Sequence, residues 1–418
     1  MKPTSILVKK IPKYLLCLFM VFCNFANAQT INTSYAAVAN MVSQANVTQI
    51  ITDFQALGVK GRNSAVTGPL VNTLNYLKNK YTSFGYTAAQ TTEQSFTNST
   101  FTNKNLIITK TGTVYPNTFV IICAHYDTFD GTTAANDSPG ADDNGSGTAA
   151  LLEVARLMKD IPTEYSIKFI HFSGEENGLI GSTAYKNNVV NATVPKMDIR
   201  LLLNIDGIGN RSTIAPNTVL CERDEINTPS TNNAASNTFN TQMISYVDFY
   251  SDLTGVVDPV NASDYIPFQT NGEVVIGLYE SGHKSSQNHN NQDILANMDP
   301  TYTFQIIKAT VGSMLHFTVA TANVVSLPVD TINTIIPQAE VELVSISPNP
   351  VKDVLTIKIK GNNIFDGMIY SSNGKFIKQF VCNLSTTVNI KEYASGTYIF
   401  VLTNRKTKQR FTKQIFKE

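Results

Sequence analysis

The chain has no tryptophan, few cysteines and no excess of charge of either sign. Its 418 residues include 5 Cys, and 32 Lys and Arg balance 32 Asp and Glu. Because the chain has no indole ring to stack on a sugar, carbohydrate binding is less favoured as its function. Cys17 and Cys23 fall in the N-terminal segment, and the three cysteines that remain are too few for a disulfide framework. No apolar run reaches the roughly 20 residues of a membrane span, so we expect none in the mature chain.

The balance of charge hides an uneven distribution along the chain. Residues 29–342 carry 16 Lys and Arg against 28 Asp and Glu, a net charge of about −12, whereas residues 343–418 carry 12 against 4. Nucleic acids bind basic faces because phosphate contacts dominate their affinity. The acidic central part therefore argues against a nucleic-acid partner, and it is compatible with the binding of divalent cations.

The first 28 residues have the pattern of a secretory signal peptide. Four lysines accompany an apolar run from Leu15 to Phe25, and the sequence Ala-Asn-Ala at 26–28 forms a cleavage site of the small-x-small type. The apolar run is too short for a membrane span. We therefore predict cleavage before Gln29 and a protein that is secreted or held at the cell surface, with an uncleaved anchor as the alternative.

Hydrophobic spacing predicts a mixed α/β domain over residues 29–325. Amphipathic helices are expected at Tyr35–Phe54, Leu70–Phe84, Leu151–Met158 and Thr301–Thr321. Short apolar runs predict buried strands at Asn105–Thr109, Thr118–Ala124, Ser166–Phe172, Arg200–Ile205 and Glu273–Leu278. Strands that alternate with helices are typical of a mostly parallel sheet covered on both faces. The stretch from Ile208 to Ser263 is rich in Asn, Thr and Ser, and we assign it to loops that shape a pocket.

Residues 343–418 have a different pattern and follow a linker at 326–342 that contains Pro328 and Pro337. Runs of alternating apolar and polar side chains, such as Leu355 to Lys360, predict β-strands, and Asn373-Gly374 is placed for a hairpin turn. Several strands of this kind predict a small β-sandwich. A carbohydrate-binding or adhesion module is the alternative interpretation.

Residues able to bind metal follow several of the predicted strands. They are His125 with Asp127, Asp142 in the loop PGADDNGSG, Glu175 with Glu176, Asp206, and His289 in the segment NHNNQD. In an open α/β sheet, groups at the carboxyl ends of the strands gather at one edge. Imidazole and carboxylate ligands suit zinc, although manganese or cobalt could occupy the same site. The pattern predicts a hydrolase with two bound metal ions.

A pair of divalent ions needs a shared carboxylate, further ligands on each ion and one free carboxylate that moves a proton. We assign the shared position to Asp142 and the general base to Glu175. The further ligands are His125 and Asp206 on one ion, and Glu176 and His289 on the other. Asp127 is expected to accept a hydrogen bond from the His125 ring. The expected cofactor is two Zn²⁺ per chain.

Five motifs, in order, resemble those of the secreted di-zinc aminopeptidase family that includes bacterial leucyl aminopeptidases. They are HYDT, PGADDNGSG, FSGEENGLIGS, LNIDGIG, and YES followed by HNNQD. The resemblance covers roughly Tyr35 to Thr321 and implies an enzyme that removes N-terminal residues from peptide substrates. It implies the same ligands and the same base, and a cis peptide bond between Asp142 and Asp143.

Two positions depart from the family pattern, and alternatives remain open. Tyr265 stands in SDYIPF where many relatives have histidine, so we assign it to the pocket wall without a catalytic role. His283 rivals His289, which is preferred because Asp293 follows it at the family's spacing. Carboxypeptidases and single-zinc glutaminyl cyclases share the scaffold, and so do non-catalytic binding proteins.

The C-terminal segments SPNPVKDVLTIKI, IYSSNGKFI and GTYIFVL resemble a second family. They are similar to the C-terminal sorting domain of proteins exported by the type IX secretion system. The resemblance covers about Leu343 to Glu418 and implies a β-sandwich that is commonly removed after export. It implies the outer-membrane secretion machinery as a partner of this part of the chain.

Overall fold

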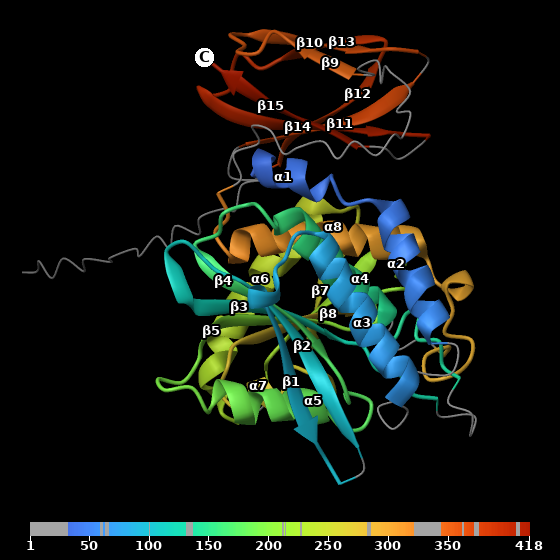
Figure 1. Cartoon of the computed structure of the whole chain (residues 1–418). Coiled ribbons are helices and arrows are strands. Elements are labelled where there is room, and N and C mark those ends of the chain that lie inside the picture. The colour runs from blue at the N-terminus through green and yellow to red at the C-terminus, as the bar shows by residue number, and fades with distance from the viewer. Residues whose placement is uncertain are drawn as a thin grey trace, which may run out of the picture. The chain divides into compact units, whose positions relative to one another are not determined.

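The computed structural model (Figure 1) describes most of the chain. The described residues are 32–58, 62, 67–99, 101–130, 137–210, 213, 215–225, 228–281, 286–321, 344–361, 363–371, 376–406 and 410–418. The predicted signal peptide, the linker at 326–342, His283 and the Asn373-Gly374 turn lie outside these residues. The chain forms two compact units, one of Ile31–Thr334 and a second that includes Ile335–Glu418.

Within the described residues, the larger unit contains an eight-stranded sheet in the order β1-β2-β4-β3-β5-β8-β6-β7. Its strands are β1 (Thr91–Thr97), β2 (Thr102–Lys110), β3 (Tyr115–His125), β4 (Tyr165–Phe172), β5 (Asp198–Ile205), β6 (Thr218–Arg223), β7 (Thr254–Pro259) and β8 (Val275–Glu280). The four central strands β4, β3, β5 and β8 run parallel, as do β6 and β7. The pairs β1–β2, β2–β4 and β6–β8 are antiparallel. The predicted mostly parallel sheet is confirmed.

Helices cover both faces of this sheet, as Figure 1 shows. One face packs against α1 (Thr33–Ala39), α2 (Gln44–Leu57), α3 (Thr67–Ser83), α4 (Gly145–Met158), α6 (Asn233–Tyr250) and α8 (Pro300–Phe317), which share one buried core. The other face packs against α5 (Ile180–Tyr185) and α7 (Ile266–Gln269) through a smaller core. Short helical turns lie at η1 (Ala88–Gln90), η2 (Lys186–Val190), η3 (Ser230–Asn232) and η4 (Leu295–Asn297). No helix in the described part of the chain is long and apolar enough to cross a membrane.

Two predictions about local structure were wrong. The predicted helix Tyr35–Phe54 is divided into α1 and α2, because the Ser43 hydroxyl accepts a hydrogen bond from the Asn46 amide and starts a new helix. The stretch from Ile208 to Ser263 is not mainly loop, since it contains β6, α6 and β7. Its polar composition hides an apolar face on α6, which tertiary packing stabilises.

The parallel strands place their carboxyl ends at one edge of the sheet. β3 ends at His125, which pairs in register with Phe172 at the end of β4. β5 ends at Ile205, which pairs with Leu278 of β8. The side chains that follow these strands therefore converge, as expected for an open α/β sheet.

The second unit consists of antiparallel strands in the part that the structure describes. One sheet has the order β13-β10-β9 and the other β12-β11-β14-β15. The strands are β9 (Val344–Ser347), β10 (Val354–Ile359), β11 (Ile364–Ser371), β12 (Phe376–Asn383), β13 (Ser385–Asn389), β14 (Gly396–Asn404) and β15 (Arg410–Lys417). Leu355 and Ile357 of one sheet and Phe365 and Phe400 of the other share a buried core. The predicted β-sandwich is confirmed.

Candidate metal centre

The carboxyl edge of the sheet brings together five of the predicted side chains. The Nε2 atom of His125 lies 3.2 Å from Oδ1 of Asp206 and 4.0 Å from Oε2 of Glu175. The Nε2 atom of His289 lies 2.9 Å from Oε2 of Glu176. His125 ends β3, Glu175 and Glu176 follow β4, Asp206 follows β5, and His289 comes after β8. Gly174 makes the turn after β4 possible with a φ of 74°.

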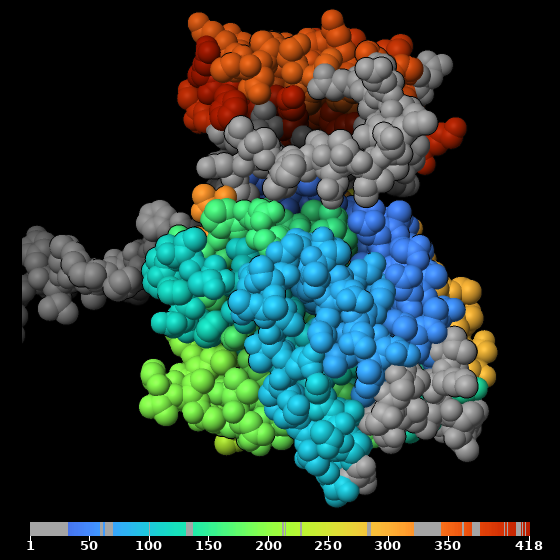
Figure 2. Space-filling model, in the orientation of Figure 1, coloured from blue at the N-terminus to red at the C-terminus, as the bar shows by residue number. Residues whose placement is uncertain are grey.

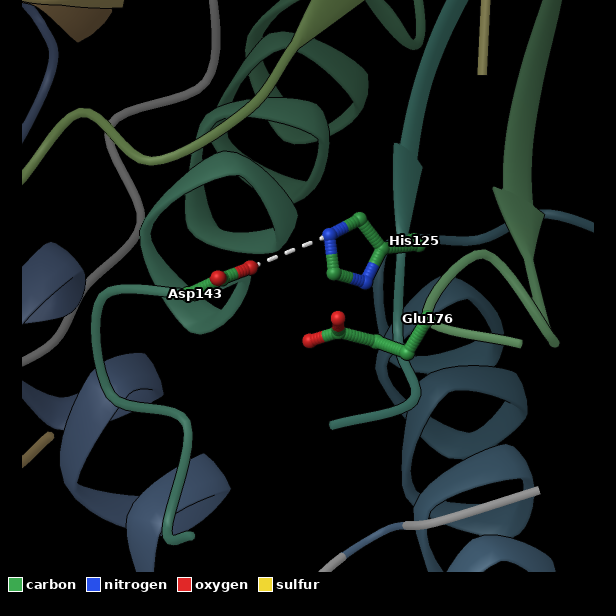
Figure 3. A group of neighbouring side chains, drawn as sticks. All are labelled: His125, Asp143 and Glu176. Atoms are coloured by element: carbon green, nitrogen blue, oxygen red, sulfur yellow. Dashed lines mark ion pairs between the residues drawn. The ribbon is translucent and has the colours of Figure 1, made fainter. Parts of the chain in front are cut away.

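Asp143, rather than Asp142, lies between the two histidines. One oxygen of its carboxylate, Oδ1, lies 3.2 Å from Nε2 of His125, and the other, Oδ2, lies 3.2 Å from Nε2 of His289. Figure 3 shows the Asp143 carboxylate facing the His125 ring, with the Glu176 carboxylate directed toward the same space. A carboxylate with one oxygen on each side has the geometry that a bridging ligand needs.

The prediction that Asp142 takes this place is therefore corrected. The Asp142 carboxylate accepts hydrogen bonds from the Gly209 amide at 2.7 Å, from the Ser146 hydroxyl at 3.1 Å and from the side-chain amide of Asn210. In the turn that leads into α4, consecutive side chains project in different directions. The cis peptide bond also lies one residue later than expected, between Asp143 and Asn144.

In the part of the chain that the structure describes, two groups of side chains have the spacing that a metal ion needs. The ligand atoms of His125, Asp143 and Glu176 lie within 4.8 Å of one another, and so do those of His125, Glu175 and Asp206. Imidazole and carboxylate donors of this kind fit zinc. Oε1 of Glu176 is buried and has no hydrogen-bond partner among the described residues, so a cation bound there would compensate it. The residues present fit a divalent metal.

Electrostatics points the same way, because many carboxylates share a buried space. Burial, opposed in part by His125, raises the pKa of the Glu175 carboxyl well above its usual value. Burial and the neighbouring Asp143 raise the pKa of Glu176 to about 7. Burial lowers the pKa of His289, but hydrogen bonds to Asp143 and Glu176 outweigh it and raise this pKa to about 9. These raised pKa values indicate that the clustered carboxylates need positive charge nearby, which a bound divalent cation would supply.

Asp127 supports the site with both its backbone and its side chain. Its backbone oxygen lies 3.1 Å from Nδ1 of His125, closer than its carboxylate Oδ1 at 3.7 Å. The same carboxylate accepts hydrogen bonds from the amides of Glu175 at 3.3 Å and Glu176 at 3.4 Å. Asp127 thus orients the His125 ring mainly through its backbone, while its carboxylate holds the turn after β4.

Other supporting residues were not predicted from the sequence. The Asp293 carboxylate accepts hydrogen bonds from the amides of Asp142 at 2.7 Å and Asp143 at 3.1 Å, and so fixes the turn before α4. The Ser263 hydroxyl donates to Oδ2 of Asp206 at 2.5 Å. The motifs HNNQD and SDYIPF contain these two residues, so the sequence carried a signal for them. Tyr265 is buried in the smaller core, and its hydroxyl accepts a hydrogen bond from the Asn261 amide.

Known proteins resemble this chain in sequence and in fold. Aminopeptidase YwaD of Bacillus subtilis is 37% identical over 117 residues, which is 28% of this chain and 24% of that protein. The chain thus spans about a quarter of this relative's length. LapA of Legionella pneumophila is similar in fold, with a TM-score of 0.58, 18% identity and coverage of 70% of this chain and 78% of its own. A glutaminyl cyclase of Bacteroides thetaiotaomicron has a TM-score of 0.50 at 18% identity and covers 65% of this chain and 97% of its own.

Two family profiles match the chain in separate regions. Residues 345–418 match the secretion system C-terminal sorting domain, which confirms the resemblance of the β-sandwich and marks the chain for export. Residues 105–314 match Peptidase family M28. This region contains all the side chains that converge at the edge of the sheet. The chain therefore belongs to peptidase family M28.

Proposed function

We propose that the protein is a zinc-dependent aminopeptidase that hydrolyses N-terminal residues from peptides with two metal ions. The observation that carries this proposal is the Asp143 carboxylate, whose two oxygens face His125 and His289. Membership of a peptidase family and the similarity to an aminopeptidase support the reaction class.

The proposed ligand set keeps four predicted residues and replaces one. Asp143 is the shared ligand in place of Asp142, and the remaining ligands are His125 with Asp206, and Glu176 with His289. When bound, a pair of zinc ions polarises a carbonyl group and lowers the pKa of water. Asp127 and Ser263 hold His125 and Asp206 in position by the hydrogen bonds described above.

Glu175 is the proposed general base. Its carboxylate lies beside His125 and Asp206, and its amide is held by the Asp127 carboxylate. Burial raises the pKa of its carboxyl, which makes the carboxylate a stronger base. Glu175 would therefore take a proton from the attacking water and deliver it to the amine of the leaving peptide.

We also propose how the chain is organised for export. Cleavage before Gln29 would release the signal peptide, residues 29–325 would form the peptidase domain, and residues 326–342 would form a linker. Residues 343–418, which contain the sorting domain, would be read by the outer-membrane secretion machinery. The mature peptidase would then act outside the cell or at its surface.

One set of measurements separates this proposal from its rivals. Purified protein would be assayed on aminoacyl anilides and on blocked and unblocked peptides, with zinc measured per chain. Two zincs and free amino acids released from unblocked peptides support an aminopeptidase. One zinc and the formation of pyroglutamate would instead identify a cyclase, and release from the C-terminus a carboxypeptidase. A wild type as inactive as the Glu175→Ala variant would identify a binding protein.

A further inference from the structure

The N-terminal helices lie outside the matched peptidase region but belong to its core. Val47, Ile51 and Phe54 on α2 are fully buried, and Val38 on α1 is 2% exposed. They pack in the same core as the sheet and α4. In Figure 2 the blue atoms of the N-terminal helices cover much of the visible face of this unit. Removal of this segment would expose the apolar core to water.

Arg62, which follows α2, is fully buried and donates hydrogen bonds to four backbone carbonyls. The acceptors are the oxygens of Tyr126 at 2.9 Å, Phe54 at 2.8 Å, Pro139 at 2.6 Å and Gly140 at 2.9 Å. Its guanidinium carbon lies 4.5 Å from the centre of the Phe54 ring. One side chain thus joins the end of α2 to two other segments of the chain.

Both of those segments carry candidate metal ligands. Tyr126 stands between His125 and Asp127, and Gly140 lies three residues before Asp143. The backbone of Arg62 extends the junction, since its amide donates to the Thr128 hydroxyl at 2.8 Å and its carbonyl accepts from the Thr128 amide at 3.2 Å. Arg62 is therefore bound both to the segment just after His125 and to the loop just before Asp143.

Helix α2 also contacts the segment that contains Asp293 and Leu295. The side-chain oxygen of Gln55 accepts a hydrogen bond from the Leu295 amide at 2.7 Å. Leu295 follows Asp293, whose carboxylate holds the amides of Asp142 and Asp143. The same helix therefore contacts the loop that fixes the shared ligand.

The charge and the shape of Arg62 suit this position. Burial lowers its pKa to about 10, while Asp293, Asp127, Asp143 and Glu176 raise it, so the guanidinium stays charged at neutral pH. A planar guanidinium has five N–H donors in a fixed fork, whereas a lysine ammonium has three on a flexible stem. Lysine keeps the charge but cannot reach all four carbonyls with the same geometry.

We propose that Arg62 is a positioning residue that holds the His125 segment and the Asp143 loop at the separation needed for metal binding. The inference rests on the proposed two-metal site. It also assigns α2 and Arg62 to the working enzyme rather than to a removable propeptide, because their loss would release both ligand segments.

The test is the zinc affinity of the metal-free full-length protein, measured by competition with a chromophoric chelator. Arg62→Lys is expected to weaken zinc binding about 10-fold to 100-fold, the usual effect of removing a partner that orients metal ligands. Arg156→Lys is the matched control, since Arg156 binds the Met41 carbonyl and the Glu153 carboxylate near α1. Its zinc affinity should equal that of the wild type.

Two further variants separate positioning from loss of stability. Ile50→Ala removes a buried side chain of α2 that is 4% exposed, and it should lower the melting temperature without changing zinc affinity. Thr128→Val removes the hydroxyl that accepts a hydrogen bond from the Arg62 amide, and so loosens the same junction. This variant replaces Arg62→Lys in the test if Arg62→Lys does not fold. It should weaken zinc binding, and Thr128→Ser, which keeps the hydroxyl, should weaken it less.

The possible outcomes are distinct. Wild-type zinc affinity in Arg62→Lys, or in Thr128→Val where Arg62→Lys does not fold, would overturn the inference and leave the proposed function intact. A wild-type protein that binds no zinc would overturn the proposed function, and the inference with it. Zinc binding that is weaker in Arg62→Lys but unchanged in Arg156→Lys supports the positioning role.

Discussion

Substitution of each of two neighbouring aspartates by asparagine tests the site, because the Asp142 and Asp143 carboxylates face different groups. Asp143→Asn removes the negative charge of a carboxylate whose two oxygens each lie 3.2 Å from a histidine Nε2 atom, one of His125 and one of His289. Loss of a residue that only hydrogen-bonds to a metal ligand costs about 10-fold to 100-fold in metal affinity or activity. Loss of a ligand shared by both ions should cost more, so we expect kcat/KM to fall by more than about 100-fold.

The same change at Asp142 should act mainly on stability. Asp142 accepts hydrogen bonds from Gly209, Ser146 and Asn210, and an asparagine keeps one oxygen acceptor but turns an amide toward another donor. One buried donor left unpaired costs about 1–3 kcal/mol of folding free energy. Asp142→Asn should therefore melt at a lower temperature and keep kcat/KM within about 10-fold of the wild type.

The assay for this pair combines zinc content with steady-state kinetics. Each variant would be dialysed, its zinc measured per chain, and its kcat/KM determined on a leucyl anilide. Asp143→Asn should lose zinc, whereas Asp142→Asn should keep it. If Asp142→Asn lost its zinc and Asp143→Asn kept it, the assignment of the shared ligand would be refuted.

Three further predictions concern the base, the supporting hydroxyl and pH. Glu175→Gln should keep its zinc but lose about 10²-fold to 10⁴-fold in kcat, because it cannot accept a proton; equal turnover would contradict the role of base. Ser263→Ala removes the hydroxyl on Asp206 and should weaken zinc binding by about 10-fold or more in the same chelator competition, with unchanged affinity as the contrary result. In the metal-free protein the pKa values of Glu176 and His289 are raised to about 7 and about 9, above their usual values of 4.5 and 6.5. The folded state then binds more protons than the unfolded state, so the stability of metal-free protein should fall as the pH rises from about 4.5 to about 9. Zinc must displace these protons, so its affinity should rise over the same range; a flat profile in both measurements would contradict the pKa directions.

Most of the side chains that converge at the edge of the sheet could be predicted from the sequence, because they follow buried parallel strands. His125, Glu175, Glu176 and Asp206 each come directly after an apolar run, and the sheet edge gathers whatever follows its strands. The choice between Asp142 and Asp143 could not be made in this way. Both precede the same helix, and the backbone conformation of the turn alone decides which carboxylate faces the histidines.

Two other features were missed, one because of a long-range contact and one because of local composition. Arg62 lies 64 residues from the Tyr126 carbonyl that it binds, and no spacing rule in the sequence connects the two. Helix α6 was missed although Met243, Tyr246, Val247 and Tyr250 recur at helical spacing and are buried. Its many Asn, Thr and Ser residues concealed that signal, because their ordinary preference is for caps and turns.

The most direct test of the central claim is a crystal structure of the zinc-loaded protein with anomalous scattering measured at the zinc absorption edge. We predict two anomalous peaks per chain, one on each side of the Asp143 carboxylate. One peak should be bound by His125 and Asp206, and the other by Glu176 and His289. Peaks elsewhere in the fold, or an Asp143 carboxylate that contacts neither ion, would contradict the account.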